Sequence, residues 1–559
     1  MEKIWLKSYP PGVPDEINPA QYHSLVELFL KSCEKYRDLP AFSNLGVEIT
    51  YDTLDKLTRD FAAYLQQTLQ LKKGERFAIM MPNLLQYPIA LFGALRAGLI
   101  VVNVNPLYTP RELSLQLHSA GAVALLVLEN FAHTVEATLA QCSLKHVLIT
   151  KVGDCFPKFK SAFVNFYLKY IKRAIPDFSF QYIPFKKALH AGKTLSFEPV
   201  PLTLEDIAVL QYTGGTTGIA KGAVLTHGNL VANVLQNLAW IHPFMKEGKE
   251  IIITAIPLYH IFSLTANCLT FIAIGAKDVL ITNPKDIRGF IKQIQHIPFS
   301  TFTGVNTLFN ALLNNPAFEK CDFSHMQLTL GGGMAVKKNV AERWQQVTGK
   351  PLLEAYGLTE TSPAVTINPL NLTSFNSTIG LPIPSTDISV RDDAGNELGV
   401  NAVGELWVKG PQVMRAYWNN PEETAKVLTP DRWLKTGDIA TVNEQGFVKL
   451  IDRKKEMILV SGFNVFPNEV EEVLSTYPKI LEVGVAGVPD QDTGEAVKAF
   501  IVKRDPSLTK EEVIEYCRTQ LTGYKIPHQI EFRDQLPKTP VGKILRRELV
   551  NLKNIVNVT

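Results

Sequence analysis

The sequence predicts an α/β protein with a large N-terminal region built on parallel-sheet lobes, a β-rich subdomain and a small α+β C-terminal domain. Its 559 residues are too many for one compact domain, and 46% apolar with 20% charged residues is ordinary globular composition. Short β-branched runs alternate with helical patterns in the first third of the chain. After about residue 380 the pattern changes to short alternating segments separated by glycine-containing turns.

Buried strands are expected where apolar β-branched runs lie between helical patterns, at residues 76–81, 99–105, 123–128 and 146–150. Residues 86–98 and 110–121 lie between these runs and carry apolar side chains at helical spacing. The strand pattern resumes at 250–258, 277–283 and 299–305. Strand–helix–strand alternation predicts parallel sheets, so we expect two sheet-centred lobes before residue 380. Residues 152–200 do not follow this alternation of strand and helix patterns and are interpreted as an insertion.

Two domains are predicted, covering residues 1–452 and 453–559. Within the first, residues 381–450 form the β-rich subdomain, because DISVRDDAGNEL and GELWVKGPQVM are typical of antiparallel strands. In the second, strand patterns alternate with helical patterns, and Pro467 lies near the first turn of the first helix.

Composition and charge exclude several classes of function. The net charge of +3 gives no argument for nucleic-acid binding. None of the six cysteines lies at CxxC spacing, which argues against a zinc site and fits a reducing compartment. The first residues show no apolar run typical of a signal peptide, and residues 261–276 are too short to span a bilayer. We therefore expect a cytoplasmic protein.

The most informative motif is YTGGTTGIAKG, which follows an apolar strand pattern and holds four glycines, three threonines and one lysine. Glycines let successive backbone N–H groups approach phosphate oxygens, and Lys221 adds a mobile positive charge. The motif is not a Walker A loop, because Lys221 is followed by Gly222 rather than by Ser or Thr. It predicts a loop that wraps a polyphosphate, and the alternative is a flexible surface turn.

A second motif is LLEAYGLTETSP. Tyr356 offers a flat face for a base, Thr359 offers a hydroxyl, and Glu360 offers a carboxylate suited to a Mg²⁺ ion that bridges phosphates. A plain turn at the end of a strand explains the pattern equally well.

Three further motifs are weaker when taken singly. In WLKTGDIA, Asp438 at the end of a strand could accept hydrogen bonds from a ribose diol, or could simply form an Asx turn. Residues 452–455 form a charged joint that could also be a solvated turn. In LPKTPVGKILRREL, Lys543 precedes a basic helix whose alternative role is a terminal amphipathic helix.

Taken together, the order and spacing of these five motifs resemble the acyl-adenylate-forming superfamily, which includes acyl-CoA synthetases, luciferases and peptide-synthetase adenylation domains. The resemblance covers essentially the whole chain. Stretches such as MMPNLLQYPIALFGALRAG and DRKKEMILVSGFNVFPNEVE are similar to bacterial long-chain-fatty-acid–CoA ligases in particular.

The resemblance implies ATP-dependent activation of a long-chain fatty acid to acyl-CoA. An acyl-adenylate forms first, and the CoA thiol then displaces AMP. The alternatives are a ligase for medium-chain or other carboxylic acids and, less expected, a non-catalytic acyl or nucleotide sensor. Amino-acid adenylation is disfavoured because PLYHIFS carries no acid to pair a substrate's ammonium group.

The resemblance also implies the site residues. Lys543, His260, Thr359 and Glu360 are the expected catalytic residues, and Glu360 with Thr216 would hold Mg²⁺. Lys543 would bridge the acyl carboxylate and the α-phosphate. The expected ATP- or AMP-binding residues are Thr213, Gly214, Gly215, Thr216, Thr217, Gly218, Lys221, Gly332, Gly333, Tyr356, Gly357, Asp438 and Arg453.

The same superfamily rotates its C-terminal domain between the two half-reactions, so this domain is expected to be mobile. Lys455 matches the hinge, and Ser461, Gly462 and Phe463 match the segment that contacts CoA.

Residues 157–175 interleave aromatic and basic side chains. Such a segment could contact the inner membrane peripherally, or it could pack its apolar side on the large domain. Fatty acid, ATP and CoA are the expected partners, nucleic acid is not, and the oligomeric state stays open with a homodimer as one option.

Overall fold

The computed structural model describes residues 2–213, 220–461, 463–490, 493–539 and 542–551. Two mainly parallel sheets form the large domain, as the alternating pattern predicts. The first has seven strands in the order β7 (Ile183–Pro184), β6 (His146–Thr150), β5 (Ala122–Leu128), β3 (Arg76–Met80), β4 (Ile100–Asn103), β8 (Ile207–Thr213) and β9 (Lys221–Thr226). β9 pairs antiparallel with β8, so the Gly/Thr-rich motif joins the two strands of a hairpin.

The second sheet has nine strands, in the order β16 (Leu381–Pro382), β15 (Ala364–Ile367), β14 (Leu352–Gly357), β13 (Leu328–Gly331), β12 (Thr301–Gly304), β10 (Ile251–Thr254), β11 (Lys277–Leu280), β1 (Pro40–Asn44) and β2 (Val47–Thr50). The sequence patterns did not predict β1 and β2. β1 pairs parallel with β11, so the N-terminal segment extends a sheet made mostly from the middle of the chain.

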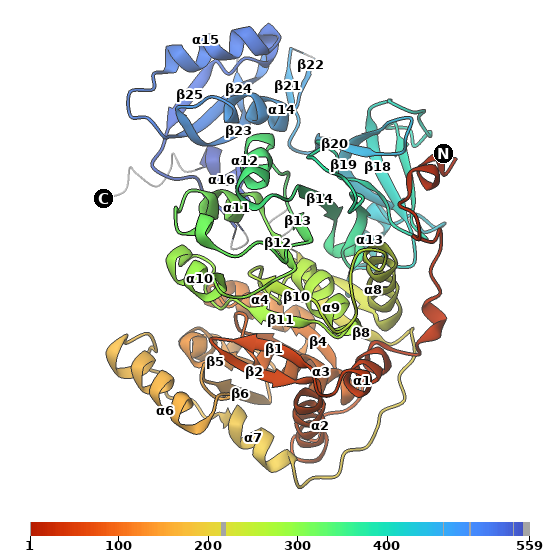
Figure 1. Ribbon diagram of the computed structural model, residues 1–559, viewed down its shortest axis with the longest axis vertical. Helices are drawn as coiled ribbons and strands as arrows, with labels where there is room; N and C mark the ends of the chain where they lie inside the picture. The colour runs from red at the N-terminus through yellow and green to blue at the C-terminus, as the bar shows by residue number, and fades with distance from the viewer. Residues whose placement is uncertain (1, 214–219, 462, 491–492, 540–541, 552–559) are drawn as a thin grey trace.

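Helices pack against both sheets (Figure 1). α3 is buried along its whole length, and the ring of Phe92 on it stacks on Phe29 of α1 with centroids 3.9 Å apart. Thr109 and Glu112 form a capping box at the start of α4, which explains where this helix begins. The helices of this domain are α1 (Leu25–Lys35), α2 (Tyr51–Gln67), α3 (Gln86–Arg96), α4 (Pro110–Ala120), α5 (Ala132–Glu136), α8 (His227–Ile241), α9 (Thr270–Ala273), α10 (Ile287–Ile294), α11 (Asn306–Leu313) and α12 (Lys338–Thr348).

The β-rich subdomain is a four-stranded antiparallel sheet, and α13 (Pro421–Val427) lies in the connection between its second and third strands. Its strands are β17 (Asp387–Arg391), β18 (Gly404–Lys409), β19 (Leu434–Val442) and β20 (Val448–Arg453). Asp438 lies within β19, opposite Arg453, and not at the end of a strand as the sequence suggested. The reason is that β19 continues through Gly437, whose φ of 71° lets the strand bend without ending.

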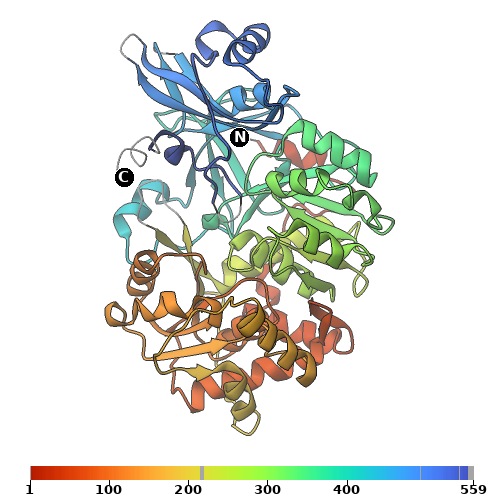
Figure 2. The same ribbon diagram turned by 90° about the vertical axis from the view of Figure 1, so that its left-hand side faces the viewer.

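The small C-terminal domain lies above the rest of the molecule in Figure 1 and again forms its top in Figure 2. Its strands are β21 (Ile458–Val460), β22 (Phe463–Val465), β23 (Ile480–Asp490), β24 (Gly494–Lys503) and β25 (Gln529–Phe532), and its helices are α14 (Pro467–Ser475), α15 (Lys510–Gln520) and α16 (Arg546–Asn551). The predicted fold class, a large α/β region with a β-rich subdomain and a smaller α+β domain, is confirmed.

The irregular region 152–200 is mostly helical. α6 (Lys158–Phe166) continues into a π-helix at Tyr167–Ile171, and α7 (Phe185–Gly192) follows the short strand β7. α6 and α7 lie at the lower edge of the molecule in Figure 1. In the part of the chain that the structure describes, no helix is both long and apolar enough to cross a membrane.

Candidate active site

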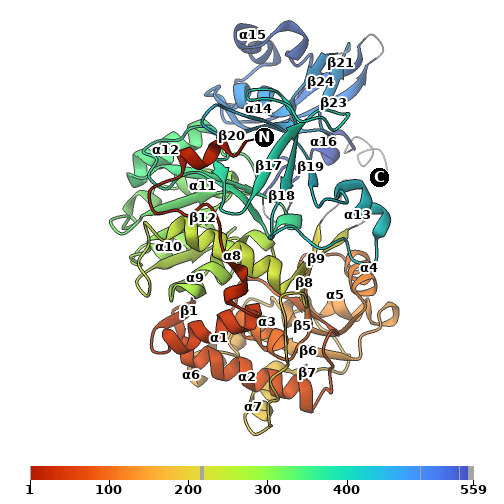
Figure 3. The same cartoon turned by 90° about the vertical axis from the view of Figure 1, so that its right-hand side faces the viewer.

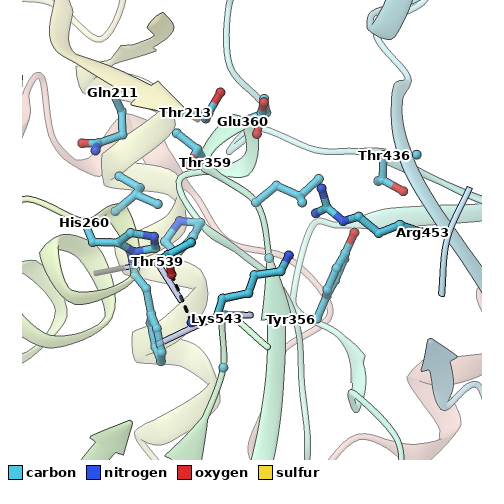
Figure 4. Close-up of a pocket in the computed structure, with 18 of the residues that line it drawn as sticks. Gln211, Thr213, His260, Tyr356, Thr359, Glu360, Thr436, Arg453, Thr539 and Lys543 are labelled. Carbon is cyan, nitrogen blue, oxygen red and sulfur yellow. Dashed lines mark hydrogen bonds between the residues drawn. The ribbon is translucent and has the colours of Figure 1, made fainter. Parts of the chain in front are cut away.

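A single cleft of about 1840 Å³ brings most of the described candidate residues together. Its walls come from the carboxyl ends of β8, β13 and β14, from the β-rich sheet and from the C-terminal domain. Carboxyl ends of parallel strands are where α/β folds place ligands. The described candidates that line the cleft are Thr213, Lys221, His260, Gly332, Gly333, Tyr356, Gly357, Thr359, Glu360, Arg453, Lys455 and Lys543. Figure 4 labels seven of them: Thr213, His260, Tyr356, Thr359, Glu360, Arg453 and Lys543.

Tyr356, Asp438 and Arg453 form one hydrogen-bonded group. The Tyr356 hydroxyl donates to Asp438 Oδ2 at 2.6 Å, and Arg453 Nε contacts Asp438 Oδ1 at 2.9 Å. The Asp438 carboxylate raises the pKa of Arg453, so the guanidinium keeps its charge although it is partly buried. Each oxygen of Asp438 retains a lone pair, so the group can still accept two hydroxyls of a ribose.

Position 357 has no room for a side chain, which explains the glycine there. A Cβ atom on it would lie 1.9 Å from the backbone oxygen of Pro363, so no other residue fits without moving the backbone. This close approach lets the chain turn directly after Tyr356 and places Thr359 and Glu360 in the cleft.

Glu360 is held by a residue that sequence reasoning missed. The Tyr417 hydroxyl donates to Glu360 Oε1 at 2.6 Å, and Met414 N donates to the Glu360 backbone oxygen at 2.7 Å. The described residues contain no cluster of three or more His, Cys, Asp or Glu side chains that could hold a metal. A single carboxylate in the cleft nevertheless fits Mg²⁺, because this ion usually takes one or two carboxylates together with substrate phosphates and water.

Lys221 begins strand β9 opposite Thr213 and forms an ion pair with Glu423 of α13. It also lies 5.4 Å from the centroid of the Tyr417 ring. Neither Glu423 nor Tyr417 was predicted to belong to the site. Glu423 lies 202 positions from Lys221, and no local pattern signals a pair at that separation.

Lys543 reaches into the cleft between His260 on one side and Tyr356 with Arg453 on the other (Figure 4). The Thr539 hydroxyl accepts a hydrogen bond from Lys543 N at 3.0 Å, and the Lys543 carbonyl accepts one from Thr539 N at 2.7 Å. Burial, together with the nearby Arg453 charge, lowers the pKa of Lys543. The amine therefore lies in an environment where its charge interacts strongly with an anion.

His260 is positioned by the segment that precedes it. The Tyr87 hydroxyl and the Asn83 amide fix the residue Leu258, with Tyr87 donating to its carbonyl at 2.9 Å and Asn83 Oδ1 accepting from its N–H at 2.7 Å. Burial lowers the pKa of His260 to about 4. Its Nδ1 accepts the N–H of Phe262 at 3.3 Å, so the neutral ring carries its proton on Nε2.

The cleft also has an apolar arm that runs between α8, the segment after His260 and the nine-stranded sheet. Thr301 and Thr303 of β12 and Val305 after it line this arm, and the extended chain from Thr301 to Val305 spans about 13 Å at about 3.3 Å per residue. The apolar side chains of this arm are Ile241, Phe262, Phe271, Val305, Leu328, Leu330, Ile367 and Leu370. Leu264 is fully buried and does not line the arm.

Two of the expected CoA-contacting residues, Ser461 and Phe463, do not line the cleft in this arrangement. Ser461 follows β21 and Phe463 begins β22, and the exposed Phe463 ring stacks on Tyr524 with centroids 4.8 Å apart. Six expected residues lie outside the described part of the chain: Gly214, Gly215, Thr216, Thr217, Gly218 and Gly462.

Lys455 follows β20 by two residues, at the passage between the two domains. Close to it, Arg546 bridges both sides of this passage. Its guanidinium contacts Asp452 at 3.2 Å, Glu471 at 3.0 Å and also Glu456. Of these carboxylates, Asp452 belongs to the large domain, so its contact with Arg546 joins the two domains in the arrangement in which Lys543 lines the cleft.

Two protein-family models match the chain. One describes AMP-binding enzymes and matches residues 29–418, and the other describes the C-terminal domain of AMP-binding enzymes and matches residues 469–543.

Curated relatives match over nearly their full length. The chain is 56% identical to a long-chain-fatty-acid–CoA ligase of Yersinia pestis and 38% identical to one of Bacillus subtilis, with 98% of each chain covered in both cases. The predicted resemblance to bacterial ligases of this type is confirmed.

Solved structures share the fold. An anthranilate CoA ligase, AuaEII, in complex with anthranoyl-AMP superposes with a TM-score of 0.84 at 22% identity, covering 96% of this chain and 99% of that one. ATP-bound MatB from Rhodopseudomonas palustris superposes with a TM-score of 0.81 at 24% identity, covering 94% and 98%. With both family models, the full-length relatives and the shared fold in agreement, the chain belongs to the family of AMP-binding enzymes.

Proposed function

We propose that the protein converts long-chain fatty acids to acyl-CoA with ATP, through an acyl-adenylate, and releases AMP and pyrophosphate. The observation that carries this proposal is one cleft that joins an apolar arm to Lys543, Glu360 and Arg453, whose guanidinium is paired with the buried Asp438. The apolar arm suits an alkyl chain, and the polar end suits a nucleotide. The full-length identity to ligases of this name supports the choice of substrate.

In the first half-reaction the fatty carboxylate would attack the α-phosphorus of ATP, and pyrophosphate would leave. Lys543 would lie between the carboxylate and the α-phosphate, where its positive charge stabilises the charge that builds up in the transition state. Thr359 would contact the α-phosphate, and Tyr356 would place its ring against the adenine beside Gly332 and Gly333. Mg²⁺, held by Glu360 together with phosphate oxygens, would neutralise phosphate charge.

In the second half-reaction the CoA thiol would displace AMP from the acyl-adenylate. A mixed anhydride is a good acyl donor, which is why activation precedes transfer. A rotation about Lys455 would withdraw Lys543 and bring Ser461 and Phe463 toward the cleft. The exposed position of Phe463 supports this proposal, because in the present arrangement its ring is available outside the cleft.

A panel of acids from acetate to oleate tests the activity of the purified protein with ATP, Mg²⁺ and CoA. We expect release of pyrophosphate, AMP and acyl-CoA to be greatest with the long-chain acids. A maximum at medium chains would select the alternative ligase, and absence of pyrophosphate with every acid would select the non-catalytic sensor.

We also infer that the enzyme contacts the inner face of the membrane through α6 and the π-helix after it. The side chains of Phe159, Phe163, Phe166 and Tyr170 are 94%, 69%, 56% and 59% exposed, although they are large and aromatic. Val164 and Leu168 pack on the domain instead, so the aromatic side faces outward. Four basic residues of the same segment accompany the aromatic ones: Lys158, Lys169, Lys172 and Arg173. Aromatic and basic side chains together suit an anionic bilayer.

Reversing the charges of Lys158, Lys169, Lys172 and Arg173 to glutamate should lower binding to anionic vesicles at least about tenfold, because each basic residue contributes about 1 kcal/mol near such a surface. Co-sedimentation with anionic and zwitterionic vesicles measures this. Lys160 should stay unchanged in the variant, because its Nζ donates to the Leu45 carbonyl at 2.5 Å. Equal sedimentation of variant and parent would refute the contact.

A further inference from the structure

Lys221 is expected to bind phosphate, but in this structure its ammonium group is already paired with the carboxylate of Glu423. The side chains are 18% and 24% exposed, so the pair is largely shielded from water. The other oxygen of Glu423 accepts a hydrogen bond from Lys426 Nζ at 2.5 Å. One carboxylate therefore pairs with two lysines, and both lysines line the cleft.

Glu423 is fixed in this place by its own helix. Asn420 Oδ1 accepts the N–H of Glu423 at 3.1 Å, and Thr424 Oγ1 accepts the N–H of Tyr417 at 2.9 Å. The chain before α13 is in turn joined to β9, because Trp418 N donates to the Gly222 carbonyl at 2.7 Å. Figure 3 shows α13 beside β9. Glu423 is thus held against Lys221 by backbone contacts and does not approach it as a loose surface side chain.

A polyphosphate on Lys221 would meet the Glu423 carboxylate on the same ammonium group. Two anions at one cation repel each other, so the phosphate must either displace Glu423 or bind beside it at a cost. Displacement does not leave Glu423 unpaired, because Lys426 already holds its second oxygen. The pKa of Glu423 is lowered to about 2 by its contacts with the two lysines, so the carboxylate keeps its charge at neutral pH.

We propose that Glu423 competes with the β- and γ-phosphates for Lys221, so that it lowers the affinity for ATP and speeds the release of pyrophosphate, with Lys426 holding the displaced carboxylate. Glu423 is a positioning residue in this proposal, since it acts through Lys221. The inference rests on the proposed function, because it takes Lys221 as a ligand of the polyphosphate.

The test compares two nucleotides that differ only in the part that reaches Lys221. Glu423→Gln keeps the shape of the side chain and removes its charge. Calorimetry should show that this variant binds a non-hydrolysable ATP analogue with Mg²⁺ about fivefold or more tightly than the parent, as expected for losing a partly buried charged contact. AMP, which has no β- or γ-phosphate, should bind both proteins equally, and inhibition by pyrophosphate should strengthen by the same factor as ATP binding.

Two further variants sharpen the test. Glu422→Gln removes an exposed charge from the same helix and should change neither affinity. Lys426→Met should weaken binding of the ATP analogue, because Glu423 then has Lys221 as its remaining lysine partner.

Unchanged or weaker binding of the ATP analogue by Glu423→Gln would overturn the inference, and so would an equal gain for AMP. Failure of the parent protein to bind either nucleotide would instead refute the proposed function.

Discussion

Replacing Lys543 with alanine should lower the rate of acyl-adenylate formation by about 10²–10³-fold, the cost of removing one group that stabilises charge in a transition state. The Lys543 backbone is held at the cleft by the hydroxyl and the N–H of Thr539, and its side chain lines the cleft together with Arg453 and Tyr356. Burial lowers the pKa of the amine, which means that the charge is costly to hold there without an anion and interacts strongly when one is bound.

The measurement separates the half-reactions. Pyrophosphate release with ATP and a long-chain acid reports adenylate formation, and acyl-CoA formation from supplied acyl-AMP reports thiol transfer. Lys543→Ala should lose the first and keep the second. Lys538→Ala is a matched control from the same segment, because the Lys538 side chain is paired with Glu482 at 2.6 Å. Equal loss of both half-reactions in Lys543→Ala would contradict the role assigned to this lysine.

Replacing Arg546 with methionine should have the second large effect. The guanidinium is 13% exposed and lies among the carboxylates of Asp452, Glu471 and Glu456. Removing it leaves these carboxylates close together and uncompensated, and breaking a buried ion pair in this way costs about 3–5 kcal/mol. Because Asp452 and Glu456 lie at the passage between the domains, the loss should fall on the orientation that places Lys543 in the cleft.

We therefore expect Arg546→Met to lower adenylate formation strongly, to lower the melting temperature and to affect thiol transfer from acyl-AMP less. Arg518→Met is the control, because Arg518 pairs with Glu515 on the surface, where both side chains are more than half exposed at 62% and 69%. A melting curve and adenylation rate for Arg546→Met that match those of Arg518→Met would show that the buried network does not hold the domain.

Hydrophobic periodicity predicted the strands and helices whose positions depend on the local sequence. The strand expected at residues 146–150 coincides with β6, and the helix expected at 110–121 ends one residue earlier, where Gly121 adopts a φ of 62°. The strands β1 and β2 were missed because they are short and join a sheet whose partner β11 is far along the chain. Pairing of that kind depends on tertiary contacts, which periodicity does not report.

The candidate site likewise contains residues that a local motif predicts and residues that only distant contacts bring together. Residues with a distinctive local motif, such as Tyr356 and Lys543, were predicted for the site, and both line the cleft. Tyr417 and Glu423 were missed, since each gains its place only through contacts with Glu360 and Lys221 from distant parts of the chain. The sequence also did not predict that Asp438 lies opposite Arg453, because this register depends on the pairing of β19 with β20.

The N-terminal pair β1 and β2 also sets an order for folding during synthesis. Asn44 of β1 donates through Nδ2 to the carbonyl of Leu280, 236 positions later in the chain. Strands β3 to β6 can assemble while the ribosome is still translating the middle of the chain, because their partners are already made. β1 has no sheet to join until β11 emerges, so its apolar residues stay exposed for much of translation. A nascent chain that stops before β11 would therefore be prone to aggregate and would depend on chaperones to keep β1 available for pairing.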